Sequence, residues 1–203
     1  MRHQTFTLAL LLSAAWLAAQ SEFAPIGAVW HYHKYEFFQF PWTTIKFYRI
    51  ESTGDTLIQG RACRILETSD PIDCTRRRNK EYVSQQGDTI WLYDQDSEEF
   101  QLLYNFGAQP GDTWTIDLIQ VLSETPLTVT IRIDSVSTVN IAGASLRRYY
   151  ASSKIQSPEE NGDFYPFEFP FTELLGAECY LFYISSFEIA PLSDTAYSRG
   201  LRC

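Results

Sequence analysis

Three Gly-Asp-Thr triplets constrain the fold of this chain more than any other feature of its sequence. They lie at Gly54–Thr56, Gly87–Thr89 and Gly111–Thr113, and each begins a run in which apolar and polar residues alternate. Glycine accepts a positive φ without steric cost, aspartate bonds its own backbone two residues on, and threonine favours extended backbone. Each triplet therefore predicts a turn followed by a strand. Their spacing is unequal, so they indicate an antiparallel meander and not a fixed-period repeat.

Period-two alternation predicts strands along almost the whole chain, most clearly at Leu127–Thr138. In Phe164–Phe171 two prolines argue against a central strand, and Thr172–Leu175 is expected to form one helical turn. The other predicted strands are Ala28–Tyr35, Thr44–Glu51, Thr56–Ile58, Ala62–Leu66, Glu81–Gln85, Thr89–Asp94, Phe100–Asn105, Thr113–Ile119, Leu146–Ser152, Cys179–Glu188 and a last one beginning at Leu201. The 203 residues thus predict one all-β domain with almost no helix, an antiparallel meander forming a curved sheet, a sandwich or a partly closed barrel.

The first twenty residues, Met1–Gln20, have the pattern of a secretory signal peptide. Arg2 gives a positive start, Phe6–Ala18 is an apolar run, and small residues suit cleavage at or just after Ala19. A membrane anchor is the alternative, but spanning a bilayer takes about 20 apolar residues and this run is shorter. We therefore expect residues 1–20 to be removed and residues 21–203 to form a single domain, secreted, periplasmic or at the cell surface.

The net charge of the chain limits the classes of partner that it is expected to bind. The formal net charge is −9, which argues against nucleic acid and anionic membranes because both need clustered positive charge. The one basic run, Arg76–Lys80, is short and isolated, which is typical of a solvated loop. The sequence leaves a cell-surface protein or a glycan as possible partners and predicts no cofactor.

Four cysteines predict disulfides if the chain is exported. They are Cys63, Cys74, Cys179 and Cys203, and an even number in an oxidising compartment favours pairing. Of the three possible connectivities, Cys63–Cys74 with Cys179–Cys203 is favoured because each bond closes a short loop. A structural zinc site is the alternative, but the chain has no C-x-x-C pair.

No motif in the chain predicts catalysis or metal binding. His31 and His33 point the same way on a predicted strand, yet half-exposed strand histidines are the better interpretation. The acidic segment 94–99 has Glu99 at its sixth position, where a calcium loop needs glycine, so it is interpreted as a hairpin turn. Nucleophile-elbow and phosphate-binding motifs are absent from the sequence. Glycoside hydrolysis needs two paired carboxylates, and the local sequence marks none as paired. The carboxylates considered are Glu159, Glu160, Asp163, Glu168 and Glu173.

Two aromatic segments, 30–42 and 164–171, are the sequence's candidates for a binding surface. Exposed rings stack on sugars or anchor protein partners. The alternative, which the sequence favours, is that these rings fill the core of a β-domain whose only methionine is Met1. The candidate ligand-binding residues are Trp30, Tyr32, Trp42, Phe164, Tyr165 and Phe167.

The order of several short motifs carries a family resemblance across nearly all of the chain after the leader. In chain order the motifs are Trp30-x-Tyr32, GDTLIQGRACRIL at 54–66, EYVSQQGDTIWLYD at 81–94, LLYNFGAQPGDTW at 102–114, the strand and glycine turn at 133–143, and ELLGAECYLF at 173–182 before the terminal LRC. This pattern resembles a group of secreted β-rich proteins of the Bacteroidota. The resemblance implies an all-β fold and export, and it implies no catalytic residues.

The chain departs from that group in two motifs and at its end. Cys63 stands where the group has an aromatic residue, and Leu174–Ala177 is a loose match to an EGIG-like segment. Members of the group often carry a C-terminal sorting domain for type IX secretion, and none follows Cys203. The sequence is therefore expected to be a fragment, or its protein to leave the cell by another route.

These observations predict a secreted, disulfide-stabilised all-β protein that acts as a binding or structural module at or outside the cell envelope. Two alternatives stay open: a barrel that carries an apolar ligand among its aromatic rings, and a hydrolase of extracellular polymers. The sequence leans against an enzyme and does not identify the ligand.

Overall fold

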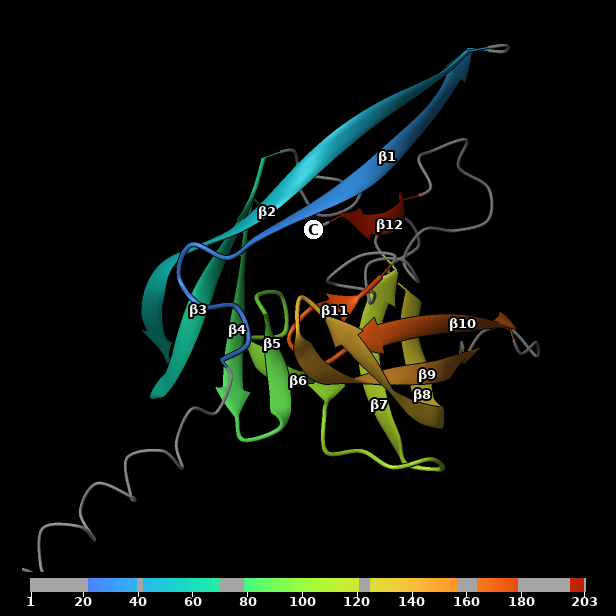
Figure 1. Ribbon diagram of the computed structural model, residues 1–203. Coiled ribbons are helices and arrows are strands. Elements are labelled where there is room, and N and C mark those ends of the chain that lie inside the picture. Colours follow the sequence, from blue (N-terminus) through green and yellow to red (C-terminus); the bar gives the residue numbers. More distant parts are fainter. Residues whose placement is uncertain are drawn as a thin grey trace, which may run out of the picture.

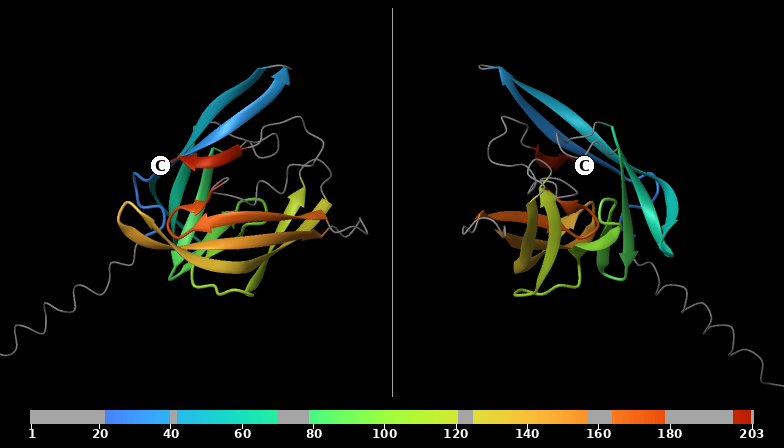
Figure 2. Two further views of the ribbon diagram at one scale, coloured as in Figure 1. Left: turned by 45° about the vertical axis from the view of Figure 1, so that its right-hand side comes forward. Right: turned by 180° about the vertical axis from the view of Figure 1, so that it is seen from behind.

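The computed structural model describes residues 22–39, 42–69, 79–120, 125–156, 164–178 and 198–202. Every regular element in these ranges is a β-strand, which confirms the all-β prediction. The strands form two antiparallel sheets, and both sheets curl so strongly that each resembles half of a barrel (Figures 1 and 2). The curved sheet and the sandwich expected from the sequence are thus combined in one architecture.

The first sheet has seven strands in the order β12-β1-β2-β3-β4-β5-β6. Apart from β12, its strands follow one another along the chain, as expected of a meander. The bounds are β1 Val29–Gln39, β2 Trp42–Ile58, β3 Arg61–Thr68, β4 Lys80–Gln86, β5 Thr89–Asp94, β6 Glu99–Asn105 and β12 Ser198–Arg202.

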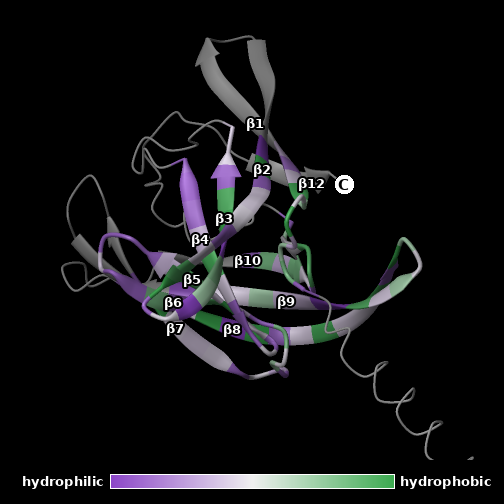
Figure 3. Cartoon of the chain, turned by 90° about the vertical axis from the view of Figure 1, so that its left-hand side faces the viewer, coloured by the Kyte–Doolittle hydropathy of each residue, from purple (hydrophilic) through white to green (hydrophobic). Residues whose placement is uncertain are grey.

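The second sheet has five strands in the order β11-β10-β9-β8-β7. Its bounds are β7 Thr113–Gln120, β8 Thr125–Ile141, β9 Ala144–Gln156, β10 Phe164–Thr172 and β11 Gly176–Ala177. Along β8 the predicted alternation is confirmed, because Val129, Ile131 and Ile133 are fully buried while Arg132 is exposed. Hydrophobic and hydrophilic segments also follow one another along β8 in Figure 3.

Two of the three Gly-Asp-Thr triplets form the predicted turns. Gly87, with φ +59°, lies in the two-residue turn between β4 and β5, and Gly111, with φ +97°, comes just before β7. The prediction is wrong for the first triplet, because Gly54 lies inside β2 at a bulge that shifts the register with β3. The turn between β2 and β3 is instead made by Gln59 and Gly60, which both have positive φ. The predicted hairpin around Gly60 is therefore confirmed, but its strand β2 runs through the first triplet.

The prolines of β10 lie where a sheet tolerates them. Pro166 falls within a register shift against β9, and Pro170 pairs with Tyr150 of β9. On its other side β10 pairs with β11 through only Phe171 and Thr172, so most of β10 borders no described strand there. After β10, residues 173–175 form a hydrogen-bonded turn and not the expected helical turn. The strand predicted at 179–188 lies outside the described residues.

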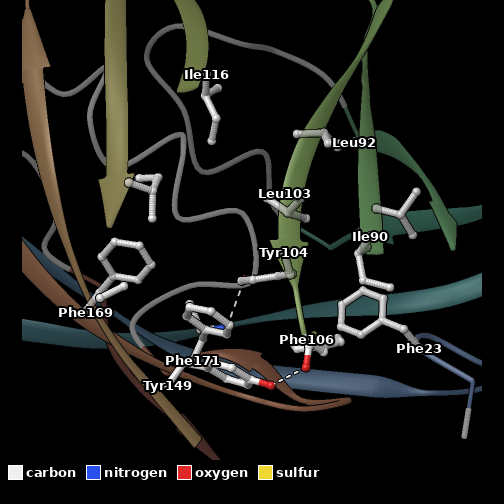
Figure 4. Packing of buried hydrophobic residues seen from close by; sticks show 14 of the residues in the cluster. Phe23, Ile90, Leu92, Leu103, Tyr104, Phe106, Ile116, Tyr149, Phe169 and Phe171 are labelled. Atoms are coloured by element: carbon white, nitrogen blue, oxygen red, sulfur yellow. Dashed lines mark hydrogen bonds between the residues drawn. The ribbon is translucent and has the colours of Figure 1, made fainter. Parts of the chain in front are cut away.

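The core between the two sheets is filled mainly by aromatic rings (Figure 4). Tyr149 and Phe171 stack with centroids 4.7 Å apart, and Tyr104 lies 5.2 Å from Phe171. Phe23, just before β1, packs against Tyr104 at 5.9 Å. These rings and the aliphatic side chains of the core, such as Ile90 and Val129, together bury the apolar area that holds the sheets together.

Polar atoms of these core rings are bonded across the two sheets. The Tyr149 hydroxyl on β9 donates to the carbonyl of Phe106, just after β6 (Figure 4). The Ala177 amide on β11 donates to the Tyr104 hydroxyl on β6 at 2.9 Å. These bonds let hydroxyls be buried without leaving a donor or acceptor unsatisfied, and they fix how the sheets face each other.

The edge strands β6 and β7 are joined by one side chain. The Gln101 amide nitrogen on β6 donates to the Asp117 carbonyl at 2.7 Å, and the Asp117 amide donates to the Gln101 side-chain oxygen at 3.0 Å. The side chain thus makes the pair of bonds that a neighbouring strand would make. It therefore satisfies backbone groups at the edge of β7 and links the edge strand of one sheet to the edge strand of the other.

Candidate functional site

A row of aromatic side chains crosses three strands on the face of the seven-stranded sheet that points away from the core. Tyr93 on β5 lies opposite Phe100 on β6, and Tyr82 on β4 lies beside Tyr93. The alternate residues Val83 and Leu92 belong to the core, so these rings project from the other face. Ring centroids are 6.5 Å apart for Tyr82 and Tyr93 and 5.1 Å for Tyr93 and Phe100.

Trp91 and Arg61 extend this row along the strands. The Trp91 indole N–H donates to the Thr89 hydroxyl at 3.1 Å, which fixes the ring. The guanidinium carbon of Arg61 lies 5.4 Å from the Trp91 ring centroid and 4.5 Å from that of Phe100. Both distances are within the range of cation–π attraction. Tyr82, Trp91, Tyr93, Phe100 and Arg61 are all partly exposed, and we call this set the aromatic face.

Curling of the sheet brings Arg61 to the aromatic rings. Arg61 is on β3 and Phe100 is on β6, three strands away, which is about 14 Å in a flat sheet. The side-chain amide of Gln59, in the β2–β3 turn, donates to the carbonyl of Glu98 in the β5–β6 turn at 2.7 Å. This bond holds the tip of the β2–β3 hairpin against the β5–β6 turn. Arg61, at the start of β3, therefore contacts rings on β5 and β6.

Two small buried residues lie beneath the aromatic face. Cys63 is 2% exposed and Ser84 is 3% exposed, although both are on the side of the sheet away from the main core. The other buried apolar residues of the described chain belong to the core cluster, and Cys63 does not. The aromatic face therefore covers a second, smaller group of buried side chains.

Cys63 is a free thiol, so the structure does not support the predicted disulfide between Cys63 and Cys74. Its side chain is packed beneath Arg61, where it donates to the Arg61 carbonyl at 3.5 Å. Burial raises the pKa of this thiol, which keeps it protonated and unreactive. The remaining cysteines, Cys74, Cys179 and Cys203, lie outside the described residues.

Arg61 differs from the other arginines in its electrostatic environment. Of the six arginines whose side chains are described, five form ion pairs with carboxylates, namely Arg49, Arg64, Arg132, Arg147 and Arg148. Arg61 has rings as neighbours and no described carboxylate, and its buried Nη1 atom has no hydrogen-bond partner. A guanidinium in this state is a donor that lacks an acceptor.

The aromatic residues proposed from the sequence are placed differently. Trp30 is 5% exposed and Tyr32 is fully buried, so both rings belong to the core, as the core alternative expected. The Trp30 indole donates to the Leu175 carbonyl at 3.0 Å, which uses its polar atom inside the protein. Trp42 of β2 and three residues of β10, namely Phe164, Tyr165 and Phe167, have side chains outside the described part.

The histidine and acidic candidates form no recognisable catalytic or metal centre in the described part of the chain. His31 is exposed, the His33 side chain is not described, and no group of three potential metal ligands occurs among the described residues. The acidic segment is a turn, as predicted, in which Asp94 accepts bonds from the Asp96 amide and the Ser97 hydroxyl. No helix in the described ranges is long and apolar enough to cross a membrane.

Two of the five carboxylates weighed for hydrolysis, Glu168 and Glu173, have described side chains. Glu168 is exposed, and Glu159, Glu160 and Asp163 lie outside the described residues. Glu173 bonds Arg147 through both of its oxygens, at 3.0 and 3.2 Å, and the hydrogen bond to Arg147 lowers the pKa of Glu173. A lowered pKa is the opposite of what a general acid needs.

Sequence reasoning missed the aromatic face, although a signal for it was present. The two-residue turn at Gly87 and Asp88 fixes the pairing of β4 with β5, and counting back places Tyr82 beside Tyr93. The alternation alone predicts two strands. The neighbouring rings emerge only when residue pairs are counted outward from the turn. Arg61 could not have been added this way, because its position depends on the curl of the sheet.

The comparisons with known proteins found no matching protein-family model, curated protein or solved structure.

Proposed function

We propose that this chain is a secreted binding module whose ligand surface is the aromatic face, and that its ligand is a glycan. The single observation that carries the proposal is the row of partly exposed rings across three adjacent strands, next to an arginine with no described carboxylate partner. Export is supported by the leader pattern of Met1–Gln20 and by the resemblance to secreted β-rich proteins of the Bacteroidota. N-terminal sequencing of the exported protein should begin at Gln20 or Ser21.

The size of the aromatic face favours a glycan over a protein. Three strands span about 10 Å, whereas a stable protein interface covers about 800 Å² on each partner. The exposed large apolar residues of the described chain, namely Ile26, Val29, Leu57 and Tyr150, lie outside the aromatic face. Two or three sugar rings match its width, and sugars stack on partly exposed aromatic side chains that have polar atoms nearby.

The geometry of the rings also limits the form of the glycan. The planes of Tyr82 and Tyr93 are inclined by 71°, and those of Tyr93 and Phe100 by 52°. Rings at these angles present no common plane, so they do not suit a flat crystalline surface. A single twisted chain, whose successive sugars turn, can contact each ring in sequence.

The experiment compares a double variant on the aromatic face with a matched surface variant. Tyr82→Ser with Tyr93→Ser removes two rings, while Tyr150→Ser removes an exposed ring, 44% accessible, from the other sheet. Affinity electrophoresis through gels containing neutral or acidic polysaccharides should show retardation of the wild type and of Tyr150→Ser by at least one polymer. We expect the double variant to lose about tenfold in affinity, because two ring contacts at about 0.5–1.5 kcal/mol each amount to about 1–3 kcal/mol. Equal retardation of the double variant, or no retardation of the wild type by any polymer, would contradict the proposal.

The two other functions expected from the sequence remain predictions without a described contact in their favour. The rings between the sheets pack against one another at 4.7–6.2 Å, which is the arrangement of a core and gives no support to a carrier. The described glutamates give no support to a hydrolase, since Glu173 is tied to Arg147.

A further inference from the structure

The charges of the described chain leave one arginine available for a ligand. The protein has 25 acidic and 16 basic residues, so carboxylate partners are plentiful within it. Even so, Arg61 has no described carboxylate partner, while the other five arginines with described side chains are paired. An arginine with no carboxylate partner among the described residues, on the surface proposed to bind the glycan, can pair with a carboxylate of the ligand.

The rings around Arg61 prepare it for such a contact. Its guanidinium lies over Phe100 and Trp91, which restricts the rotation of the planar group before a ligand arrives. A guanidinium whose plane is fixed presents its N–H groups as a fork, which matches the two oxygens of a carboxylate. The buried Nη1 atom of Arg61 has no hydrogen-bond partner among the described residues.

The surroundings of Arg61 distinguish between kinds of anionic polymer. The β5–β6 turn beside Phe100 carries exposed Asp96, Glu98 and Glu99, and Gln59 brings this turn against the hairpin that holds Arg61. A polymer with several charges on each sugar, such as a sulfated chain, would be strongly repelled by these carboxylates. A chain with no more than one carboxylate on each sugar is repelled less and can still reach Arg61.

We propose that the glycan bound by the aromatic face contains uronic acid residues, and that Arg61 recognises their carboxylate. This inference rests on the proposed function and names its ligand class. A sugar ring stacks on Tyr82 or Tyr93, while the carboxylate of a neighbouring unit lies against the Arg61 guanidinium on the side away from its buried Nη1 atom. No covalent step is involved.

The test uses pairs of probes that differ only in charge. Oligomers of α-1,4-galacturonate and of β-1,4-mannuronate are each compared with their methyl esters, which keep the sugar chain and remove the negative charge. Titration calorimetry of the wild type should show that at least one acid binds about tenfold more tightly than its ester, the value of one hydrogen-bonded charge pair. Arg61→Gln should lower the ratio of acid to ester affinity to about one.

Control variants separate recognition from folding. Arg132→Gln removes an exposed arginine on the other sheet and should leave both affinities unchanged. If Arg61→Gln fails to fold, Arg61→Lys keeps the charge without the planar fork and should reduce the acid-to-ester ratio several-fold. Thermal unfolding by circular dichroism establishes which variants are folded.

The outcomes distinguish failure of this inference from failure of the proposed function. If ester and acid bind equally and Arg61→Gln has no effect, or if only neutral glycans bind, the uronic acid inference is overturned while the glycan-binding surface stands. If the wild type binds no glycan in the calorimeter or the gels, both are overturned. If an oligoglutamate peptide binds as tightly as the acid and Tyr82→Ser with Tyr93→Ser does not weaken it, the ligand is an acidic peptide and the inference is wrong.

Discussion

Two aromatic residues of one strand have different roles on the two faces of the first sheet. Tyr104 of β6 is fully buried in the core and accepts a hydrogen bond from Ala177. Phe100 of the same strand projects from the opposite face and lies beneath the Arg61 guanidinium. Both roles suit an aromatic ring, so composition alone cannot assign them, and only the register of the strand separates core from surface.

Tyr149 provides a prediction about pH. Burial raises the pKa of its phenol from 10.0 to about 12, so the folded state holds this proton more tightly than the unfolded chain does. Its stabilising contribution is therefore complete below pH 10.0 and is lost as the pH rises from 10.0 through about 12. Tyr149→Phe should lessen this loss in urea unfolding measured across that range, and should cost about 1–3 kcal/mol at neutral pH because the Phe106 carbonyl loses its donor.

The neighbouring Tyr150 is the matched control for this measurement. It is exposed on the same strand, so Tyr150→Phe should retain the wild-type fall in stability at high pH. If Tyr149→Phe and Tyr150→Phe have the same pH dependence as the wild type, the buried phenol does not account for the effect.

Cys63 provides a second prediction at this scale. Because its thiol is buried and its pKa is raised, iodoacetamide should modify it slowly in the folded protein and rapidly in urea. Non-reducing peptide mapping should find Cys63 as a free thiol. A Cys63–Cys74 crosslink would contradict the structure and restore the pairing expected from the sequence.

The strands are the elements that sequence reasoning predicted best. The predicted and observed bounds of β5 agree, those of β4 differ by one residue at each end, and those of β6 differ by one residue at its start, because short turns limit strands whose alternation is regular. The first Gly-Asp-Thr triplet was assigned wrongly because Gly54 serves a bulge. A bulge and a turn both favour glycine, and only pairing with β3 distinguishes them.

The link between β6 and β7 can be tested by removing the side chain that makes it. Gln101→Ala loses two hydrogen bonds to the Asp117 backbone, so we expect a loss of about 2 kcal/mol in the free energy of unfolding, at about 1 kcal/mol for each bond. Gln101→Glu should cost more, since a carboxylate cannot donate to the Asp117 carbonyl. Chemical denaturation measures both variants.

Gln86→Ala is the control for Gln101, because Gln86 is exposed at the end of β4. This variant should change the free energy of unfolding by less than about 0.5 kcal/mol. An equally small effect for Gln101→Ala would mean that the two sheets are held at this edge by other contacts.

For the molecule as a whole, the sequence predicted the fold class and left the site to the structure. Period-two patterns and turns are local, so they were sufficient to predict an all-β meander of curved sheets. The aromatic face depends on curling that brings β3 over β6, fixed by a contact between Gln59 and the distant Glu98. Contacts of this kind leave no local pattern, and for that reason Arg61 was not among the residues chosen from the sequence.

The central claim is that the aromatic face is the ligand surface, and heteronuclear NMR tests it most directly. The indole N–H of Trp91 and the Nε–H of Arg61 are followed while oligogalacturonate or oligomannuronate is added, with Trp91→Phe and Arg61→Lys used to assign the signals. We predict that these two resonances shift and saturate together, while the indole signals of Trp30 and Trp114 stay fixed. Shifts confined to other residues, or no shift of Trp91 and Arg61 with a polymer that binds, would contradict the account.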